Sequence, residues 1–411
     1  MKHVCILYRL ISCCDRFHRH FIDHVPGYLR EIKMTMSRQN LLAAAVALIE
    51  DESDDELDDI IALASIVSAR TDRNRVPLYY EKVIDTYFDF EFMRLFRLSR
   101  ETHAELAGRF EASAFYPDSV GGRPQISAEK TLLIVLSYVG TRATMYQIAD
   151  RFDITESSVH LCIERVLNFL NSISAQIITW PDQERRRRSQ AGFLRKTKGK
   201  GPHKTIGAID GCHVEILRPT ESPNSYYNRS KFHSIVLQGI CDDQNQFIDV
   251  YIGFPGSAHD ARILKESPIF EDAEAKCAGG YLLGDSAYPL LPYVMTPFKS
   301  SKAALPSWKT TYNTKHGQQR VTIENTFGLL KQRFRRMYLV DSASIRQCCL
   351  VVMGACVLHN LCNTERDFFD DLNNARPPDQ VTNDDDHAIQ PDDATRSLSE
   401  RIREAIAKTE C

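Results

Sequence analysis

The stretch TIGAIDGCHV, residues 205–214, decides the fold because it joins a run of small apolar side chains to one carboxylate, Asp210. Such a run is typical of a buried strand. A buried carboxylate without a partner is costly, so Asp210 needs a cation or hydrogen-bond donors beside it. The stretch LLGD, residues 282–285, delivers Asp285 in the same way. If the two strands are neighbours, the carboxylates meet, and their repulsion favours a cation between them.

A third acid stands in RVTIENTFGLLKQRFRRM, residues 320–337, which has helical periodicity. Its apolar stripe consists of Ile323, Phe327, Leu330, Phe334 and Met337. The adjoining stripe consists of Arg320, Glu324, Gly328, Lys331 and Arg335. This layout suits a metal ligand beside a track of basic groups for phosphates, with Lys331 and Arg335 as candidate DNA contacts. A charged helix face exposed to solvent gives the same spacing, so both readings stay open.

Composition limits the class of protein without naming a partner. The chain has 411 residues, of which 43% are hydrophobic and 26% charged, and its net charge is -3. This length suits two or three globular domains. The 12 cysteines show no regular disulfide spacing, which indicates a reducing compartment.

No membrane or secretory segment is expected. The longest apolar runs, such as CCLVVMGACVL at 348–358, are shorter than the ~20 residues that a membrane span needs. The N-terminal run MKHVCILYRLISCC is interrupted by Arg9 and does not resemble a secretory signal. Met34 and Met36 are alternative start residues, and the acidic run at 50–59 is expected to be a solvated face or loop.

The region before the first strand is expected to be helical. Helices are predicted from Ser127, an N-cap, to Gly140, at 144–153, and at 155–173 with Thr155 as the cap. The last two have the spacing of a helix-turn-helix, whose second helix can enter a DNA major groove. Ser157 and His160 would then be DNA contacts at its exposed start. A small helical bundle that does not bind DNA is the alternative.

The segment 185–204 contains nine Lys or Arg residues and no acid. We expect an exposed linker that contacts phosphates or serves as a nuclear import signal, with Arg185 and Arg186 as candidate DNA contacts. A solvated loop without a partner is the alternative.

Strands and helices then alternate. DDQNQ at 242–246 is a hairpin turn between two strands, and helices are expected at 320–338 and 345–363, so an α/β domain with a mixed sheet is predicted. The expected organisation is an N-terminal extension, partly disordered, at 1–79; a helical region at 80–178; a basic linker at 179–204; an α/β domain at 205–363; and an acidic tail at 364–411. The tail is expected to be largely disordered until the run SLSERIREAIAKTE near its end.

Several motifs resemble one family when taken together and in order. They are GAIDGCHV, SYYNRSKFHSIVLQGICD, GFPGSAHDARIL, LLGDSAYPLLPYVMTPF and RVTIENTFGLLKQRF. This set resembles the DDE nuclease domain of PIF/Harbinger-type transposases and of the Harbinger-derived nucleases, in register from about Trp180 to Asn363. The helical region from about residue 80 resembles the N-terminal helix-turn-helix of the same family.

The resemblance implies an RNase H-like fold and a DNA nuclease that uses divalent metal, Mg²⁺ or Mn²⁺. The catalytic and metal-binding Asp, Asp and Glu of the family correspond to Asp210, Asp285 and Glu324. The resemblance and the helix pattern also point to supporting residues, which are Asp260, Asn228, Arg229 and Arg320. His259 is expected to have a packing role.

The resemblance also implies DNA as the partner, a Myb-like companion protein, and the nucleus, with the cytoplasm as a second location; a homo-oligomer is a further expectation. The alternative function is a domesticated DNA-binding protein that keeps the fold without cleaving. Two other classes fit less well. A haloacid-dehalogenase-type phosphatase needs a second Asp where Cys212 stands, and a zinc site at Cys356, His359 and Cys362 lacks a partner pair, so core roles are expected for these residues. The target sequence and the retention of cleavage stay open.

Overall fold

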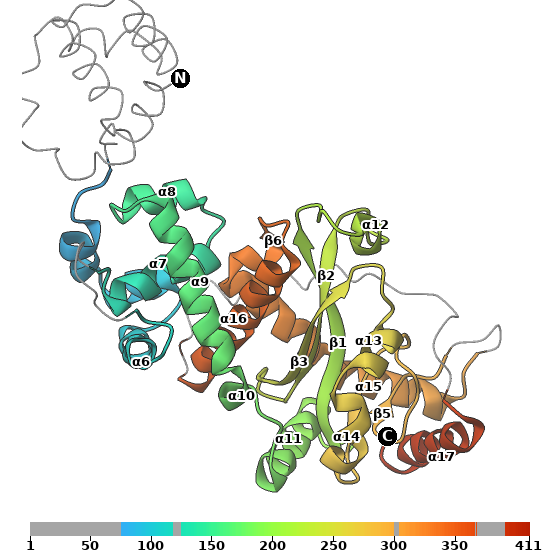
Figure 1. The fold of residues 1–411 in the computed structure, drawn as a ribbon. Coiled ribbons are helices and arrows are strands. Elements are labelled where there is room, and N and C mark those ends of the chain that lie inside the picture. The colour runs from blue at the N-terminus through green and yellow to red at the C-terminus, as the bar shows by residue number, and fades with distance from the viewer. Residues whose placement is uncertain (1–74, 118–124, 300–303, 366, 368–390) are drawn as a thin grey trace, which may run out of the picture. The chain divides into compact units, whose positions relative to one another are not determined.

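The computed structural model describes residues 75–117, 125–299, 304–365, 367 and 391–411 (Figure 1). The contacts divide the chain into Met1–Asn74 and Arg75–Cys411, and every described residue belongs to the second unit. The acidic run at 50–59 and the start candidates Met34 and Met36 lie outside the described residues.

The first part of this unit is helical, as predicted. Its elements are η3 (Tyr79–Val83), η4 (Ile84–Thr86), α5 (Asp89–Phe96), α6 (Arg100–Glu111), α7 (Ala128–Gly140), α8 (Met145–Arg151), α9 (Glu156–Ser172) and α10 (Ser174–Ile177). The predicted caps are confirmed: Ser127 accepts from Lys130 N before α7, and Thr155 accepts from Ser158 N before α9. Each hydroxyl satisfies a helix N–H that has no partner within the helix.

Helices α8 and α9 form at the positions predicted for the helix-turn-helix. Asp153, with φ 52°, makes the turn between them. The buried face of α9 packs against α7, α8 and α16 (Ile345–Thr364). Ser157 and His160 are exposed near the start of α9, where a DNA contact is sterically open. Their contact with DNA stays a prediction.

A mixed six-stranded sheet follows in the described chain, which confirms the α/β class. Its strands are β1 (Thr205–Ile216), β2 (Ser234–Cys241), β3 (Phe247–Pro255), β4 (Tyr281–Leu283), β5 (Val294–Met295) and β6 (Leu339–Val340). Their order is β3-β2-β1-β4-β5, and β6 also pairs with β1. Strands β1, β2 and β3 are antiparallel neighbours, whereas β4 and β6 run parallel to β1. The stretch that opens the sequence argument is therefore the central strand.

Helices cover both faces of this sheet (Figure 1). Helices α15 (Ser307–Arg333) and α16 lie on one face, where their apolar residues join Ala208, Cys212 and Val214 in the main core. Helices α13 (Asp260–Glu266) and α14 (Ile269–Cys277) lie on the other, in a core with Ile209, Ile240 and Ile248. The predicted stripe from Ile323 to Met337 is buried, and Met337 lies in the short helix η5 (Arg335–Tyr338) that follows α15.

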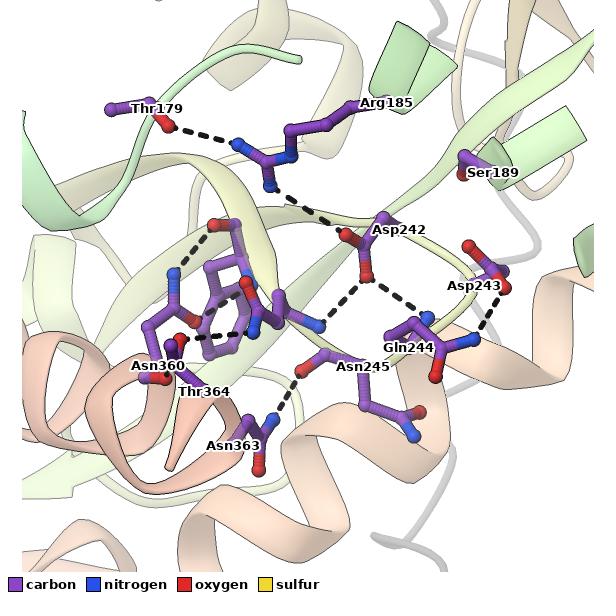
Figure 2. Close-up of polar contacts among 12 residues, drawn as sticks. Thr179, Arg185, Ser189, Asp242, Asp243, Gln244, Asn245, Asn360, Asn363 and Thr364 are labelled. Carbon is purple, nitrogen blue, oxygen red and sulfur yellow. Dashed lines mark hydrogen bonds and ion pairs between the residues drawn. The ribbon is translucent and has the colours of Figure 1, made fainter. Parts of the chain in front are cut away.

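The basic segment at 179–204 is not an open linker: it contains α11 (Gln183–Lys196), capped by Asp182 and packed on β1 and α15. Figure 2 shows Arg185 turned toward the protein, where it donates to Thr179 Oγ1 at 3.0 Å and lies 3.8 Å from Asp242 Oδ2. Arg186 donates to the Pro181 carbonyl. Two of the four consecutive arginines therefore anchor the helix and the β2–β3 turn, a role that composition cannot reveal.

The helix predicted at 345–363 forms as α16, and a further helix lies closer to the C-terminus. Helix α16 is 20 residues long and, among the described helices, is the one with the length and apolar composition of a membrane span. It packs against α9 and β3 inside the unit, as core helices do, so it is weak evidence for a span. Helix α17 (Asp393–Thr409) covers most of the run SLSERIREAIAKTE, at which the expected disorder of the tail ends; it buries Ile406 and Ala407 and contacts α15.

Candidate active site

The edge of β1 is open around Asp210. On one side, β2 pairs with β1 from Ala208 to Glu215. On the other side, β4 pairs with β1 only as far as Ala208, and β6 begins at Glu215. Residues 209–214 thus have no strand partner on that side within the described chain, and we call this stretch the open edge of β1.

Asp285 comes to the same place because β4 is the parallel neighbour of β1. Ala208 is paired with Leu283. Asp210 and Asp285 each stand two residues beyond this last pair, at the same level of the sheet. The Asp285 carboxylate accepts from Ala287 N at 2.9 Å, which fixes the turn after β4.

Arg320 bridges the other two predicted acids. Its Nη1 donates to Asp210 Oδ2 at 2.9 Å, and its Nη2 donates to Glu324 Oε1. Arg320 and Glu324 are four residues apart on α15, so they share one face of the helix. The side chains of Arg320, Asp210 and Glu324 are 18%, 19% and 10% exposed, respectively, so the guanidinium stabilises carboxylates that water reaches poorly.

The electrostatics of Asp210 reflect this setting. Burial raises the pKa of Asp210 to about 7; the Arg320 guanidinium opposes that rise, and the charge of Asp285, then that of Glu324, adds to it. Asp285 and Glu324 therefore both act on Asp210, as expected when like charges lie near a partly buried carboxylate.

The donor set suits a hard divalent cation. Mg²⁺ and Mn²⁺ prefer carboxylate oxygens. As the side chains stand, no three His, Cys, Asp or Glu residues in the described ranges are close enough to hold a metal ion. The Arg320 guanidinium lies between Asp210 and Glu324. A cation that binds both must displace this guanidinium.

The far face of β1 carries a fourth acid. Asp260, the first residue of α13, is buried, and its Oδ1 lies where a side chain at residue 211 would be: a Cβ on Gly211 would come within 2.4 Å of it. Gly211 is thus required for this close approach. The Tyr288 hydroxyl is buried without a hydrogen-bond partner among the described groups, and burial, then the charge of Asp260, raises its pKa.

The other predicted residues have separate positions. Asn228 is buried and donates to Ser234 Oγ, so its side chain holds its own loop against β2. Arg229 is exposed and approaches the His259 ring at 3.4 Å. Lys331 donates to the His213 carbonyl at 2.7 Å, which satisfies an acceptor on the open edge of β1, and Arg335 is exposed.

Sequence reasoning missed two features of the site. Arg320 was predicted as a supporting residue, but its bridge between two acids was not foreseen; the pairing of Arg320 and Glu324 at i, i+4 was the available signal. Tyr288 was missed altogether, because nothing in SAYP indicates a buried hydroxyl.

The zinc alternative is not supported. Cys356, His359 and Cys362 are buried in α16, and His359 Nε2 bonds the Asn245 carbonyl at 2.8 Å. These are core positions, as expected.

Comparisons with known proteins agree with the motif resemblance. Residues 209–360 match the family described as DDE superfamily endonuclease. "Protein ALP1-like" of Arabidopsis thaliana is 25% identical over 295 residues, which cover 66% of this chain and 70% of that protein. "Putative nuclease HARBI1" is 29% identical over 241 residues in Bos taurus and 28% over 245 in Homo sapiens; both matches cover 57% of this chain and 67% of the relative.

No solved structure gives a significant match to the chain. The family match begins at Ile209, beside the central carboxylate, and ends at Asn360 in α16, so it includes every strand-borne and helix-borne acid of the open edge. The recognition made from the motifs is confirmed: residues 209–360 of this chain are a DDE superfamily endonuclease domain.

Proposed function

We propose that the chain is a metal-dependent DNA nuclease of the Harbinger type, with Asp210, Asp285 and Glu324 as its catalytic and metal-binding residues. One observation carries the proposal: Arg320 bridges Asp210 of β1 and Glu324 of α15, and Asp285 follows β4, the parallel neighbour of β1, at the level of Asp210. We take the sheet to be the RNase H-like core that the family resemblance implies.

The side chains have distinct roles in this proposal. Asp210 and Glu324 would hold Mg²⁺ or Mn²⁺ in place of the Arg320 guanidinium, and Asp285 would be a third source of oxygen ligands. When bound, such ions activate an attacking water or 3′-hydroxyl and stabilise the leaving oxygen of a phosphodiester. The displaced Arg320 remains a charge-assisted donor suited to a DNA phosphate. No protein nucleophile is required.

The test is cleavage of plasmid DNA by the purified chain with MgCl₂ or MnCl₂. We expect nicked or linear product from the wild type and a loss of at least about a hundredfold in Asp210→Asn, Asp285→Asn and Glu324→Gln, because each removes an ionic ligand from the site. Glu215→Gln is the matched control, since Glu215 is an exposed acid on the same strand. Equal cleavage by wild type and all three variants would refute the assignment.

DNA binding without cleavage by the wild type, in either metal, would instead favour the domesticated DNA-binding alternative. The same preparation tests the remaining proposals of DNA contact through α9 and of a nuclear location. A Ser157→Ala, His160→Ala variant should bind DNA less tightly, and a fluorescent fusion of the full chain should accumulate in nuclei.

A further inference from the structure

A small polar pocket lies beyond the acids along β1. Among its lining residues are His213 of β1, Asn228 and Arg229 of one loop, and Gly256, Ser257 and His259 of another. His213 stands three residues after Asp210, about 10 Å along an extended strand. The pocket therefore lies within the reach of a DNA strand that is engaged at the acids.

Buried contacts build the walls of the pocket. Asn228 Nδ2 donates to Ser234 Oγ at 2.9 Å, and the same hydroxyl lies 3.0 Å from His213 Nδ1. Gly256 packs so closely that a Cβ there would lie 2.1 Å from Ser234 Oγ. The two loops are thus fixed against the start of β2 before any ligand arrives, which lowers the entropy lost on binding.

The charge of the pocket comes from its rim. Arg229 is exposed, and its Nη2 lies 3.4 Å from Nε2 of His259. Burial, with the nearby Lys331 charge, lowers the pKa of His213 to about 4, so His213 is neutral at neutral pH. An arginine fork beside serine hydroxyl and imidazole groups is the chemistry that recognises phosphate oxygens.

We propose that this pocket binds a backbone phosphate of the DNA, with Arg229 and His259 as its main ligands. The proposal rests on the proposed nuclease function and adds a second contact that holds the strand at the open edge of β1. Side chains alternate along a strand, so Asp210 and His213 point to opposite faces of the sheet. The DNA strand must therefore pass over the unpaired edge to reach both.

The experiment measures binding of a short DNA duplex to the full chain in EDTA, where metal-dependent cleavage is absent. We expect Arg229→Gln to bind about tenfold more weakly. The slope of its log affinity against log salt concentration should be less negative by about 0.9, because one phosphate contact is lost. Arg229→Lys should keep the slope while losing part of the affinity, since it keeps the charge but not the planar fork.

Arg401→Gln is the control, because Arg401 is an exposed arginine on α17 away from the pocket. Inorganic phosphate should compete with DNA more strongly than chloride of equal ionic strength in the wild type, and this difference should vanish in Arg229→Gln. An unchanged slope and affinity in Arg229→Gln would overturn the pocket, even if cleavage is intact. The expected slope change in a chain that does not cleave would support the pocket and refute the nuclease.

Discussion

Replacing Arg320 by methionine tests the electrostatic account of the site directly. The change removes the guanidinium that bridges Asp210 and Glu324 and keeps an unbranched apolar stem in its place. Removing one partner of a fully buried ion pair costs about 3–5 kcal/mol. Because the two carboxylates are 19% and 10% exposed, part of that penalty is relieved by water. We therefore expect the free energy of unfolding to fall by about 2–3 kcal/mol in EDTA.

Divalent metal should reverse much of this loss. In the wild type a cation must displace Arg320, whereas in Arg320→Met the carboxylates are free to bind it. At ten times its dissociation constant, a cation adds about 1.4 kcal/mol to the free energy of unfolding. Urea unfolding followed by circular dichroism, with EDTA, MgCl₂ or MnCl₂, measures both effects, and Arg401→Met is the control for loss of an exposed arginine. The reasoning is refuted if Arg320→Met is as stable as the wild type in EDTA and gains no more from metal.

Two further predictions concern the packing and the acid sensitivity of the fold. Gly211→Ala should lower the free energy of unfolding by about 1–3 kcal/mol, because its Cβ would meet Asp260 Oδ1 at 2.4 Å. Gly317→Ala, a helical glycine with no atom within 4 Å of the added Cβ, should stabilise by up to about 1 kcal/mol in the same urea titration. Burial lowers the pKa of His316 and of His359 to about 4, below the unfolded value of 6.5, so the folded state binds fewer protons and stability falls as pH drops from about 6.5 toward 4. Each histidine should account for about 2 kcal/mol of loss between pH 7 and 4.5, and His359→Gln should show a correspondingly smaller loss; an equal loss would contradict the assignment.

The sequence predicted features that depend on a few neighbouring residues. Hydrogen bonds and periodicity within one element determine such features, so they could be predicted. They are the Ser127 and Thr155 caps, the β2–β3 turn and the buried stripe of α15. The pairing of β1 with β4 entered the sequence argument only as a condition for the two aspartates to meet, and the structure meets that condition.

Features that depend on partners far away in the chain could not be predicted from the sequence. The basic run at 185–188 lies in helix α11, where Arg185 forms an ion pair with Asp242, 57 positions away in the chain. Helix α15 begins at Ser307, well before the predicted residue 320, since its first turns bury Tyr312 and His316 against other segments and lack a simple apolar period. The bridge from Arg320 to Asp210 joins residues 110 apart, so no local pattern reports it.

The open edge of β1 links the two proposals physically. Had β4 continued past Ala208, its backbone would occupy the place where a cation and a phosphate must approach. Because β4 stops there and β6 starts only at Glu215, the intervening residues have no strand partner on that side in the described chain, and Lys331 Nζ donates to the His213 carbonyl there. Because successive residues of a strand face opposite sides of the sheet, Asp210 faces α15, whereas Gly211 and His213 face the side of α13. A single strand thereby supplies an acid on one face and a pocket wall on the other, and this shared strand is what couples the proposed metal site to the proposed phosphate pocket.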